Sequence, residues 1–153
     1  MIYPRHIVYS LEALAYLACQ EKGTYSKVHS MAVKLNIPRH YLGKILTELV
    51  KKGLVSSIKG PAGGFVLNGN VSNFALFDVL QSLGGIEKLQ ERCVMGFGDC
   101  SSETPCVFHD LWSEFKEGAI SEIQKLTLED FSQILRKRIM SGPNLKTETK
   151  ATA

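Results

Sequence analysis

Three cysteines and one histidine near the middle of the chain have the residue types of a metal centre. Cys93, Cys100 and Cys106 follow the pattern Cys-x6-Cys-x5-Cys in a loop that contains glycine, and His109 comes three residues after the last thiol. Three thiolates and an imidazole make a complete set of four ligands. An iron–sulfur cluster and a structural Cys3His zinc site both fit this set.

The cysteine spacing favours the iron–sulfur cluster over zinc. Common zinc modules place cysteines in close Cys-x2–4-Cys pairs, and the sequence contains no such pair. Wider spacing suits a larger cluster, whose ligand atoms lie farther apart. A redox-active trio of thiols without metal is the third interpretation. Because Thr104-Pro105 is predicted to open a long helix, we expect Cys106 in its first turn, where the helix dipole favours thiolate.

Two other roles for cysteine are less well supported by the sequence. Cys19 lies on the flank of an apolar helical segment and is predicted to be a buried structural thiol. Cys106 and His109 have the residue types of a nucleophile and a base. However, no Gly-rich phosphate loop, cofactor fingerprint or partnering acid at useful spacing accompanies them, so we do not expect an enzyme.

Length and composition indicate an ordinary globular protein. The chain has 153 residues, of which 44% are apolar and 22% charged, enough for one domain and an accessory element. No apolar run approaches the roughly 20 residues that cross a bilayer. Glu12 interrupts the N-terminal apolar stretch, so we expect no secretory signal and a cytoplasmic location. In a reducing cytosol, clustered thiols more often bind metal or sense redox state than form disulfides.

The charge is distributed unevenly along the sequence. Residues 1–65 carry a net charge of +6, and the remaining residues carry −3. A basic N-terminal half indicates contact with a polyanion such as DNA, although a solvated basic face would give the same count.

The basic half has the pattern of a helix-turn-helix. Apolar periodicity predicts a helix over 5–21, a second short helix capped by Ser26, and a third from Pro38 to about Lys52. The third helix would read DNA. Its predicted DNA-facing residues are Arg39, His40, Tyr41, Lys44, Thr47 and Lys51.

A β-hairpin is predicted directly after the reading helix. Two β-type runs, 54–58 and 65–67, flank the turn-rich segment 59–64. A hairpin in this place is a wing, whose tip can enter the minor groove. The expected wing contacts are Lys59, Gly60 and Pro61.

The C-terminal half is predicted to be helical. Ser72 or Asn73 would cap a helix to Leu83, a short helix would cover 86–91, and a long helix with a wide apolar stripe would run over 106–126. Thr127 would cap a last helix. A small domain cannot cover that wide stripe alone, so we expect a homodimer, which palindromic DNA operators favour; the alternative is that the helix packs back on its own chain.

Together these features resemble the Rrf2 family of winged-helix transcription regulators, most nearly its IscR-type iron–sulfur branch. The residues that carry the resemblance are Tyr41-Leu42, the run from Lys52 to Val55, the wing from Gly60 to Phe65, the three cysteines and His109. The resemblance covers about residues 1–138. It implies a dimeric, cluster-controlled regulator whose third helix reads the major groove.

The sequence departs from the IscR-type pattern at several positions. The first cysteine interval has six residues instead of five, Gly43 replaces an acidic residue, and the wing cation is Lys59 where relatives often have arginine. Some relatives take a fourth ligand from a carboxylate near the partner's N-terminus, but residues 1–11 contain no Asp or Glu. His109 is therefore the expected fourth ligand, and His6 of a partner chain is the alternative.

The sequence thus predicts a mainly α fold, a winged helix-turn-helix with a long C-terminal dimerisation helix. We expect a cytoplasmic homodimer, most simply a repressor. Its affinity for double-stranded DNA would depend on an iron–sulfur cluster, [2Fe–2S] before [4Fe–4S], that senses iron, redox state or nitric oxide. The alternative is a zinc-stabilised module without a sensing role. The expected divisions are a DNA-binding domain (1–83), a cluster-binding loop region (84–106), dimerisation helices (107–140) and a disordered tail (141–153).

Overall fold

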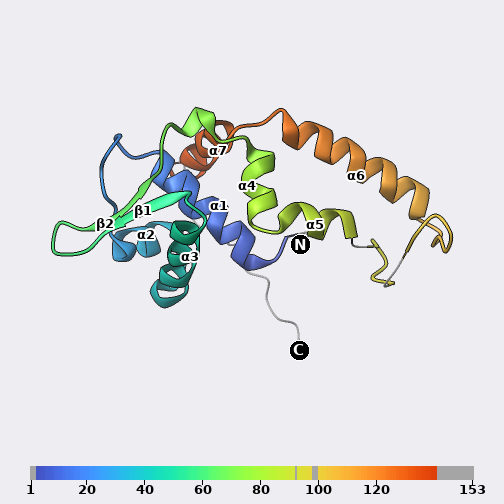
Figure 1. Ribbon diagram of the computed structural model, residues 1–153, viewed down its shortest axis with the longest axis horizontal. Coiled ribbons are helices and arrows are strands. Elements are labelled where there is room, and N and C mark those ends of the chain that lie inside the picture. The colour runs from blue at the N-terminus through green and yellow to red at the C-terminus, as the bar shows by residue number, and fades with distance from the viewer. Residues whose placement is uncertain (1–2, 92, 98–99, 141–153) are drawn as a thin grey trace.

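The computed structural model describes residues 3–91, 93–97 and 100–140. It is mainly helical with one two-stranded antiparallel hairpin, as predicted. Figure 1 shows a cluster of elements at one end and a long helix extending from it. The elements in chain order are α1 (Arg5–Ala18), α2 (Val28–Leu35), α3 (Arg39–Lys51), β1 (Val55–Ile58), β2 (Gly64–Leu67), the 3-10 helix η1 (Val71–Asn73), α4 (Leu76–Ser82), α5 (Gly85–Glu91), α6 (His109–Gln124) and α7 (Leu128–Met140).

Helices α1, α2 and α3 pack around one apolar core. Their apolar residues recur every three or four positions, so each helix presents one stripe to the others. Burial of these stripes is the main force that stabilises the unit. The largest fully buried side chains of the three helices are Ile7, Leu14, Met31, Leu42, Leu46 and Leu49.

The turn between α2 and α3 has a specific backbone conformation. Asn36 adopts the left-handed region with φ 51° and ends α2, which asparagine tolerates better than most residues. Ile37 is buried in the core, and its N–H donates to the carbonyl of Ala32 at 3.0 Å. The turn is therefore anchored at its centre, which fixes the angle at which α3 leaves it.

The hairpin β1–β2 pairs from Val55↔Leu67 to Ile58↔Gly64. A third stretch of backbone joins it, because Ser26 forms an isolated antiparallel bridge with Phe65. The prediction that the Ser26 side chain caps α2 is wrong. Lys27 holds the N-cap position, and the backbone of Ser26 pairs with the wing instead.

A second bridge, Ala75↔Thr127, joins the start of α4 to the link between α6 and α7. Ala75 is the N-cap of α4, so the prediction of a cap at Ser72 or Asn73 is wrong; those residues lie in η1. The predicted capping role of Thr127 is confirmed, since its hydroxyl accepts from the N–H of Asp130 at 3.2 Å.

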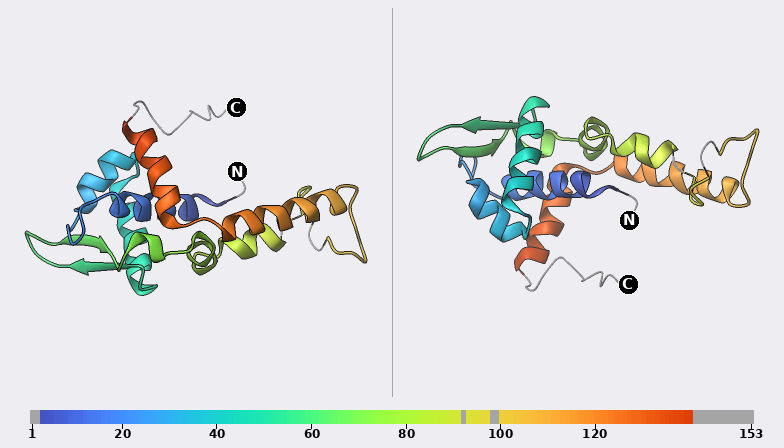
Figure 2. Two further views of the ribbon diagram at one scale, coloured as in Figure 1. Left: turned by 90° about the horizontal axis from the view of Figure 1, so that it is seen from above. Right: turned by 90° about the horizontal axis from the view of Figure 1, so that it is seen from below.

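Helices α6 and α7 have different surroundings. Leu128 and Leu135 of α7 are buried in the same core as α1, so α7 folds back onto the helix-turn-helix. In contrast, α6 has no buried residue. Figures 1 and 2 show α6 leaving the domain beside α5, with the cysteine loop at its far end.

Two expectations concern the ends and the environment of the chain. The expected tail, 141–153, lies outside the described residues. Within the described part of the chain, no helix is long and apolar enough to cross a membrane.

Candidate metal centre and nucleic-acid interface

The cysteine loop connects two helices that lie side by side. Cys93 comes two residues after the end of α5, and Cys106 comes three residues before the start of α6. Lys116 of α6 donates to the carbonyl of Gln90 at 2.9 Å and so ties α6 to the end of α5. Across the loop that leads from α5 to α6, the Sγ atoms of Cys93 and Cys106 lie 3.6 Å apart.

Cys100 and His109 complete the group. The Sγ of Cys100 lies 3.2 Å from Nδ1 of His109, and it accepts a hydrogen bond from the N–H of Cys106 at 3.4 Å. The three Sγ atoms of Cys93, Cys100 and Cys106 all lie within 4.8 Å of one another. The structure therefore brings together all four ligands that the sequence predicts.

The thiols have unequal acidities. Partial desolvation raises the pKa of Cys93, but hydrogen bonds from the Met95 backbone and from Cys106 outweigh it, so this pKa is lowered. For Cys106 the hydrogen bond from the Phe108 backbone lowers the pKa, but desolvation and the neighbouring thiols Cys100 and Cys93 raise it overall. The group thus stabilises one thiolate at the expense of another, as expected when sulfur atoms crowd together.

The prediction that Cys106 lies in the first turn of the long helix is wrong. Helix α6 begins at His109, and its N-cap Phe108 has φ −108° and ψ 8°. The N–H of Cys106 donates to the Cys100 thiol, and only its carbonyl accepts a turn bond, from the N–H of His109 at 3.0 Å. Cys106 therefore lies in the turn that precedes α6 and not within the helix.

The donor set fits a thiolate-ligated metal group. Three half-buried free thiols and one imidazole nitrogen converge from both sides of the loop. Thiolate and imidazole are ligands of both iron–sulfur clusters and zinc. When bound, such a group would hold the loop against the start of α6, and an iron–sulfur cluster would add one-electron redox chemistry.

The other predicted candidates lie apart from this group. Cys19 is half-buried and not buried as predicted; its Sγ donates to the carbonyl of Ser132 at 3.6 Å, and partial burial raises its pKa. His6 is exposed in the first turn of α1. Within this chain, His109 is the histidine next to the thiols.

An apolar groove lies beside the thiols, and the sequence analysis does not predict it. It has a volume of about 340 Å³ and includes Val94 and Met95 of the loop. Its other side is the apolar stripe of α6, in which Trp112 and Phe115 stack with ring centroids 5.1 Å apart. Leu111 and Phe115 are 67% and 51% exposed. The stripe was visible in the sequence, but the loop had no periodicity that would reveal its side of the groove.

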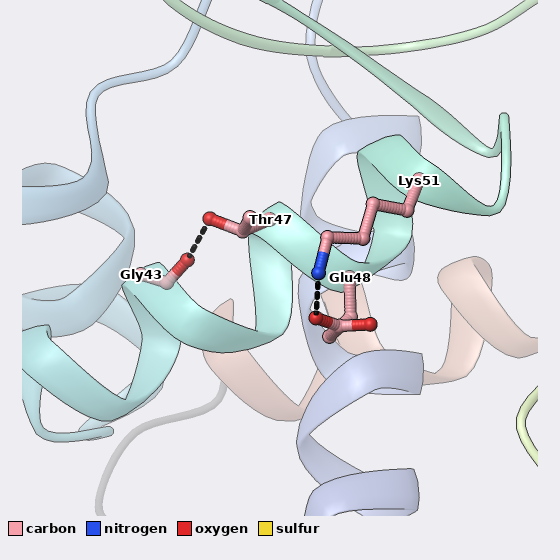
Figure 3. Close-up of polar contacts among 4 residues, drawn as sticks. All are labelled: Gly43, Thr47, Glu48 and Lys51. Atoms are coloured by element: carbon pink, nitrogen blue, oxygen red, sulfur yellow. Dashed lines mark hydrogen bonds and ion pairs between the residues drawn. The ribbon is translucent and has the colours of Figure 1, made fainter.

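Helix α3 presents most of the predicted DNA-facing residues to solvent. Arg39, His40, Lys44, Thr47 and Lys51 are exposed. The hydroxyl of Thr47 donates to the carbonyl of Gly43 at 2.9 Å, and Nζ of Lys51 donates to Glu48 at 2.7 Å (Figure 3).

Tyr41 has a different environment from the rest of that face. Its ring is half-buried and packs edge-on against Tyr9 of α1, with ring centroids 5.8 Å apart. Tyr41 thus helps to set how α3 lies on α1.

The wing tip is exposed at Lys59, Gly60 and Pro61. Gly60 has φ +107°, a conformation that L side chains rarely adopt. Figures 1 and 2 show the hairpin projecting beyond the helices at the end of the molecule opposite the cysteine loop. The proposed DNA face and the thiol group are therefore well separated along the molecule.

Comparisons with known proteins agree with this arrangement. A family model, Rrf2, described as an iron-dependent transcriptional regulator, matches residues 3–133. A protein of Aquifex aeolicus described as an HTH-type transcriptional regulator is 34% identical over 141 residues, covering 91% of this chain and 96% of that one. The regulator IscR of Klebsiella pneumoniae is 26% identical over 145 residues, with 95% and 88% covered.

Solved structures support the same fold. CymR, the global cysteine regulator of B. subtilis, aligns with a TM-score of 0.66 at 24% identity, covering 86% of this chain and 96% of that one. IscR of T. potens aligns with a TM-score of 0.63 at 19% identity, covering 94% and 93%. The fold is a winged helix-turn-helix, and the three-cysteine group is typical of the IscR-type branch. The chain therefore belongs to the Rrf2 family of DNA-binding transcriptional regulators, which are not enzymes.

Proposed function

We propose that this protein is a cytoplasmic, homodimeric repressor whose affinity for its operator depends on an iron–sulfur cluster. The observation that carries the proposal is the convergence of three thiols within 4.8 Å, with His109 Nδ1 3.2 Å from Cys100 Sγ. In this proposal Cys93, Cys100, Cys106 and His109 are the ligands. His6 of a partner chain is the alternative source of the fourth.

Iron is favoured over zinc by two independent arguments. The family is described as iron-dependent. The intervals of six and five residues between cysteines differ from the close pairs of zinc modules. We favour a [2Fe–2S] cluster, with [4Fe–4S] as the alternative.

The proposed DNA face consists of the exposed side of α3 and the wing tip. Arg39, Lys44 and Lys59 are cations that can contact phosphates or guanine edges. The full set is Arg39, His40, Tyr41, Lys44, Thr47 and Lys51 in the major groove and Lys59, Gly60 and Pro61 in the minor groove. A repressor would act by occupying the operator and so excluding the transcription machinery.

The proposed dimer surface is the apolar stripe of α6. A contiguous exposed apolar patch marks a protein interface, and a second copy of the same helix would cover it symmetrically. Leu111, 67% exposed on this stripe, is the residue to test. Leu111→Glu should convert the dimer to a monomer in sedimentation velocity, whereas Val33→Glu, a change at an equally exposed apolar residue of α2, should leave it dimeric.

The test of the proposed function is to purify the protein without oxygen and measure its metal content, visible absorption and Mössbauer spectrum. An iron–sulfur protein absorbs in the visible, and removal of the cluster should change its operator affinity. A colourless, zinc-containing protein whose DNA binding depends on zinc only through folding would support the zinc alternative.

A further inference from the structure

The reading helix α3 carries a single acidic residue among its cations. Within Arg39–Lys51, Glu48 is the only carboxylate, and it accepts a hydrogen bond from Nζ of Lys51 at 2.7 Å (Figure 3). The two side chains are 59% and 66% exposed. Their charges cancel on the last turn of the helix, where a basic residue would otherwise attract phosphate.

The fold does not need this pair. An exposed ion pair adds little to stability, because solvent screens it and both side chains lose freedom. The next residue, Lys52, is already used by the fold, since its Nζ donates to the carbonyl of Ser82 at 2.5 Å. In the structure, therefore, both lysines at the end of α3 are engaged with groups of the protein.

We infer that Glu48 lowers the affinity of α3 for DNA of any sequence, because it neutralises Lys51 on the face proposed to meet DNA. Binding to random sequence comes almost entirely from cations that neutralise phosphates. A carboxylate in contact with Lys51 lies well within the Debye length of about 8 Å, so it also repels any phosphate that Lys51 approaches. Operator binding depends in addition on base contacts, so these contacts supply a larger share of the operator binding free energy when the general attraction is weaker.

This inference rests on the proposal that α3 faces DNA, and the chain offers a matched control. Glu122 and Lys125 at the end of α6 form the same kind of pair, with the same i, i+3 spacing, at 2.6 Å and similar exposure. Glu122→Gln therefore makes the same change in net charge and releases a lysine in the same way. Figure 1 shows this end of α6 above the domain, away from α3.

The experiment is to titrate a random-sequence DNA duplex with the full-length protein over a series of salt concentrations. Glu48→Gln should bind this duplex more tightly and steepen the slope of log K against log salt by about 0.9 per protomer, the value of one added phosphate contact. Its advantage over wild type should then shrink by about 3.5-fold per protomer for each fourfold rise in salt. Glu122→Gln should match wild type.

Lys51→Gln tests whether the gain in affinity comes from the lysine that Glu48→Gln releases. In the wild-type background it leaves Glu48 without its lysine and should weaken binding to random sequence, whereas in the Glu48→Gln background it should abolish the gain in affinity and in salt slope. Thermal unfolding should be the same for all four proteins. A gain that persists in the variant carrying both Glu48→Gln and Lys51→Gln, or a Glu48→Gln protein that binds random DNA like wild type, would overturn the inference.

Lys44→Ala in the same series distinguishes this failure from that of the proposed DNA face. If Lys44→Ala weakens binding but Glu48→Gln has no effect, α3 contacts DNA and only the inference fails. If neither change has an effect, α3 does not contact DNA. If Glu48→Gln weakens operator binding selectively, Glu48 itself contacts a base and the inference is again overturned.

Discussion

The backbones of Ser26 and Phe65 exchange two hydrogen bonds. The N–H of Ser26 donates to the carbonyl of Phe65 at 2.8 Å, and the N–H of Phe65 donates back to the carbonyl of Ser26 at 2.9 Å. Ser26 lies just before α2, and Phe65 lies in the second strand of the wing. The helix-turn-helix and the wing are thus joined directly, so the orientation of one constrains the other.

The bridge between Ser26 and Phe65 predicts that Gly64→Ala destabilises the protein. A Cβ at Gly64 would lie 2.6 Å from the carbonyl oxygen of Ser26, closer than any normal contact. We expect the free energy of unfolding to fall by about 1–3 kcal/mol, the usual cost of overpacking. Urea denaturation measures it.

Gly43→Ala is the control for this change. Nothing lies within 4 Å of its Cβ position, and it sits inside a helix, where alanine is more stable than glycine by roughly 0.5–1 kcal/mol. We expect this variant to be slightly more stable than wild type. Equal stability changes in the two variants would mean that the bridge does not constrain the wing.

The Ser26–Phe65 bridge also shows which features of the fold can be predicted from the sequence. The helices and the hairpin follow from local periodicity and turn residues, and these predictions are confirmed. Ser26 was expected to cap α2, because its residue type is typical of an N-cap. Its actual partner depends on a strand far along the chain, and local pattern contains no information on such pairings.

The candidate ligand group can also be predicted from local sequence. Residue type and spacing predict Cys93, Cys100, Cys106 and His109 as one group, and in the structure the three thiols converge with His109 beside Cys100. The backbone between Cys100 and His109 was not predictable, because the Cys106 N–H turns to a thiol instead of starting the helix. Local propensity at Thr104-Pro105 favours the start of a helix, but the Cys106 N–H donates to the Cys100 thiol and the helix begins later.

Lys44→Ala should weaken operator binding. Lys44 is exposed on the proposed DNA face, one turn before Glu48. The loss should be about 1–3 kcal/mol if its ammonium contacts a base edge, and the variant should lose discrimination at that base pair. Fluorescence anisotropy with the operator and with a point-substituted operator measures both effects. Unchanged affinity at every salt concentration would remove Lys44 from the interface.

Lys59→Ala should reduce binding most at operators with a narrow A·T-rich minor groove. Lys59 lies exposed at the base of the wing turn, and the negative potential of a narrow minor groove attracts an inserted cation. Binding is compared on operators that differ only in the base pairs under the wing. An equal loss on G·C-rich versions would mean that Lys59 contacts phosphate alone.

Asp130 should make stability depend on pH. Its carboxylate accepts hydrogen bonds from the hydroxyl and the N–H of Thr127, at 2.7 and 2.8 Å, and both lower the pKa of Asp130. A carboxyl whose pKa is lowered on folding stabilises the protein above its unfolded pKa of about 3.9, and this stabilisation is lost as pH falls through the lower folded pKa.

Asp130→Asn should therefore be less stable than wild type at pH 7, and the difference should shrink as the pH falls below about 4. Urea unfolding across pH measures it. Glu129→Gln removes a charge from the same turn of α7 and should show a smaller pH-dependent difference. A constant gap between wild type and Asp130→Asn at all pH values would exclude the cap as its source.

Helix α6 contacts the DNA-binding domain towards its C-terminal end, where Ile123 packs against the core, and it meets the thiol group at its N-terminal end. Near its C-terminal end, Leu126 accepts from the N–H of Leu76 at 2.9 Å, next to the Ala75↔Thr127 bridge. Its N-terminal end meets the loop at His109. A change in how the loop holds α6 and α5 would therefore alter the direction of α6 relative to α3.

This arrangement predicts that loss of the proposed cluster changes operator affinity without unfolding the protein. Two reading helices must meet half-sites about 34 Å apart, so a small change in the angle of α6 within a dimer is enough. The cluster shifts that equilibrium only if it binds one dimer geometry better than the other. Cys93, Cys100 and Cys106 are replaced together with alanine, and Cys19→Ala is the control. If the triple variant stays dimeric and binds every operator as the cluster-containing protein does, the cluster is not a switch. If the triple variant unfolds, the metal has a structural role.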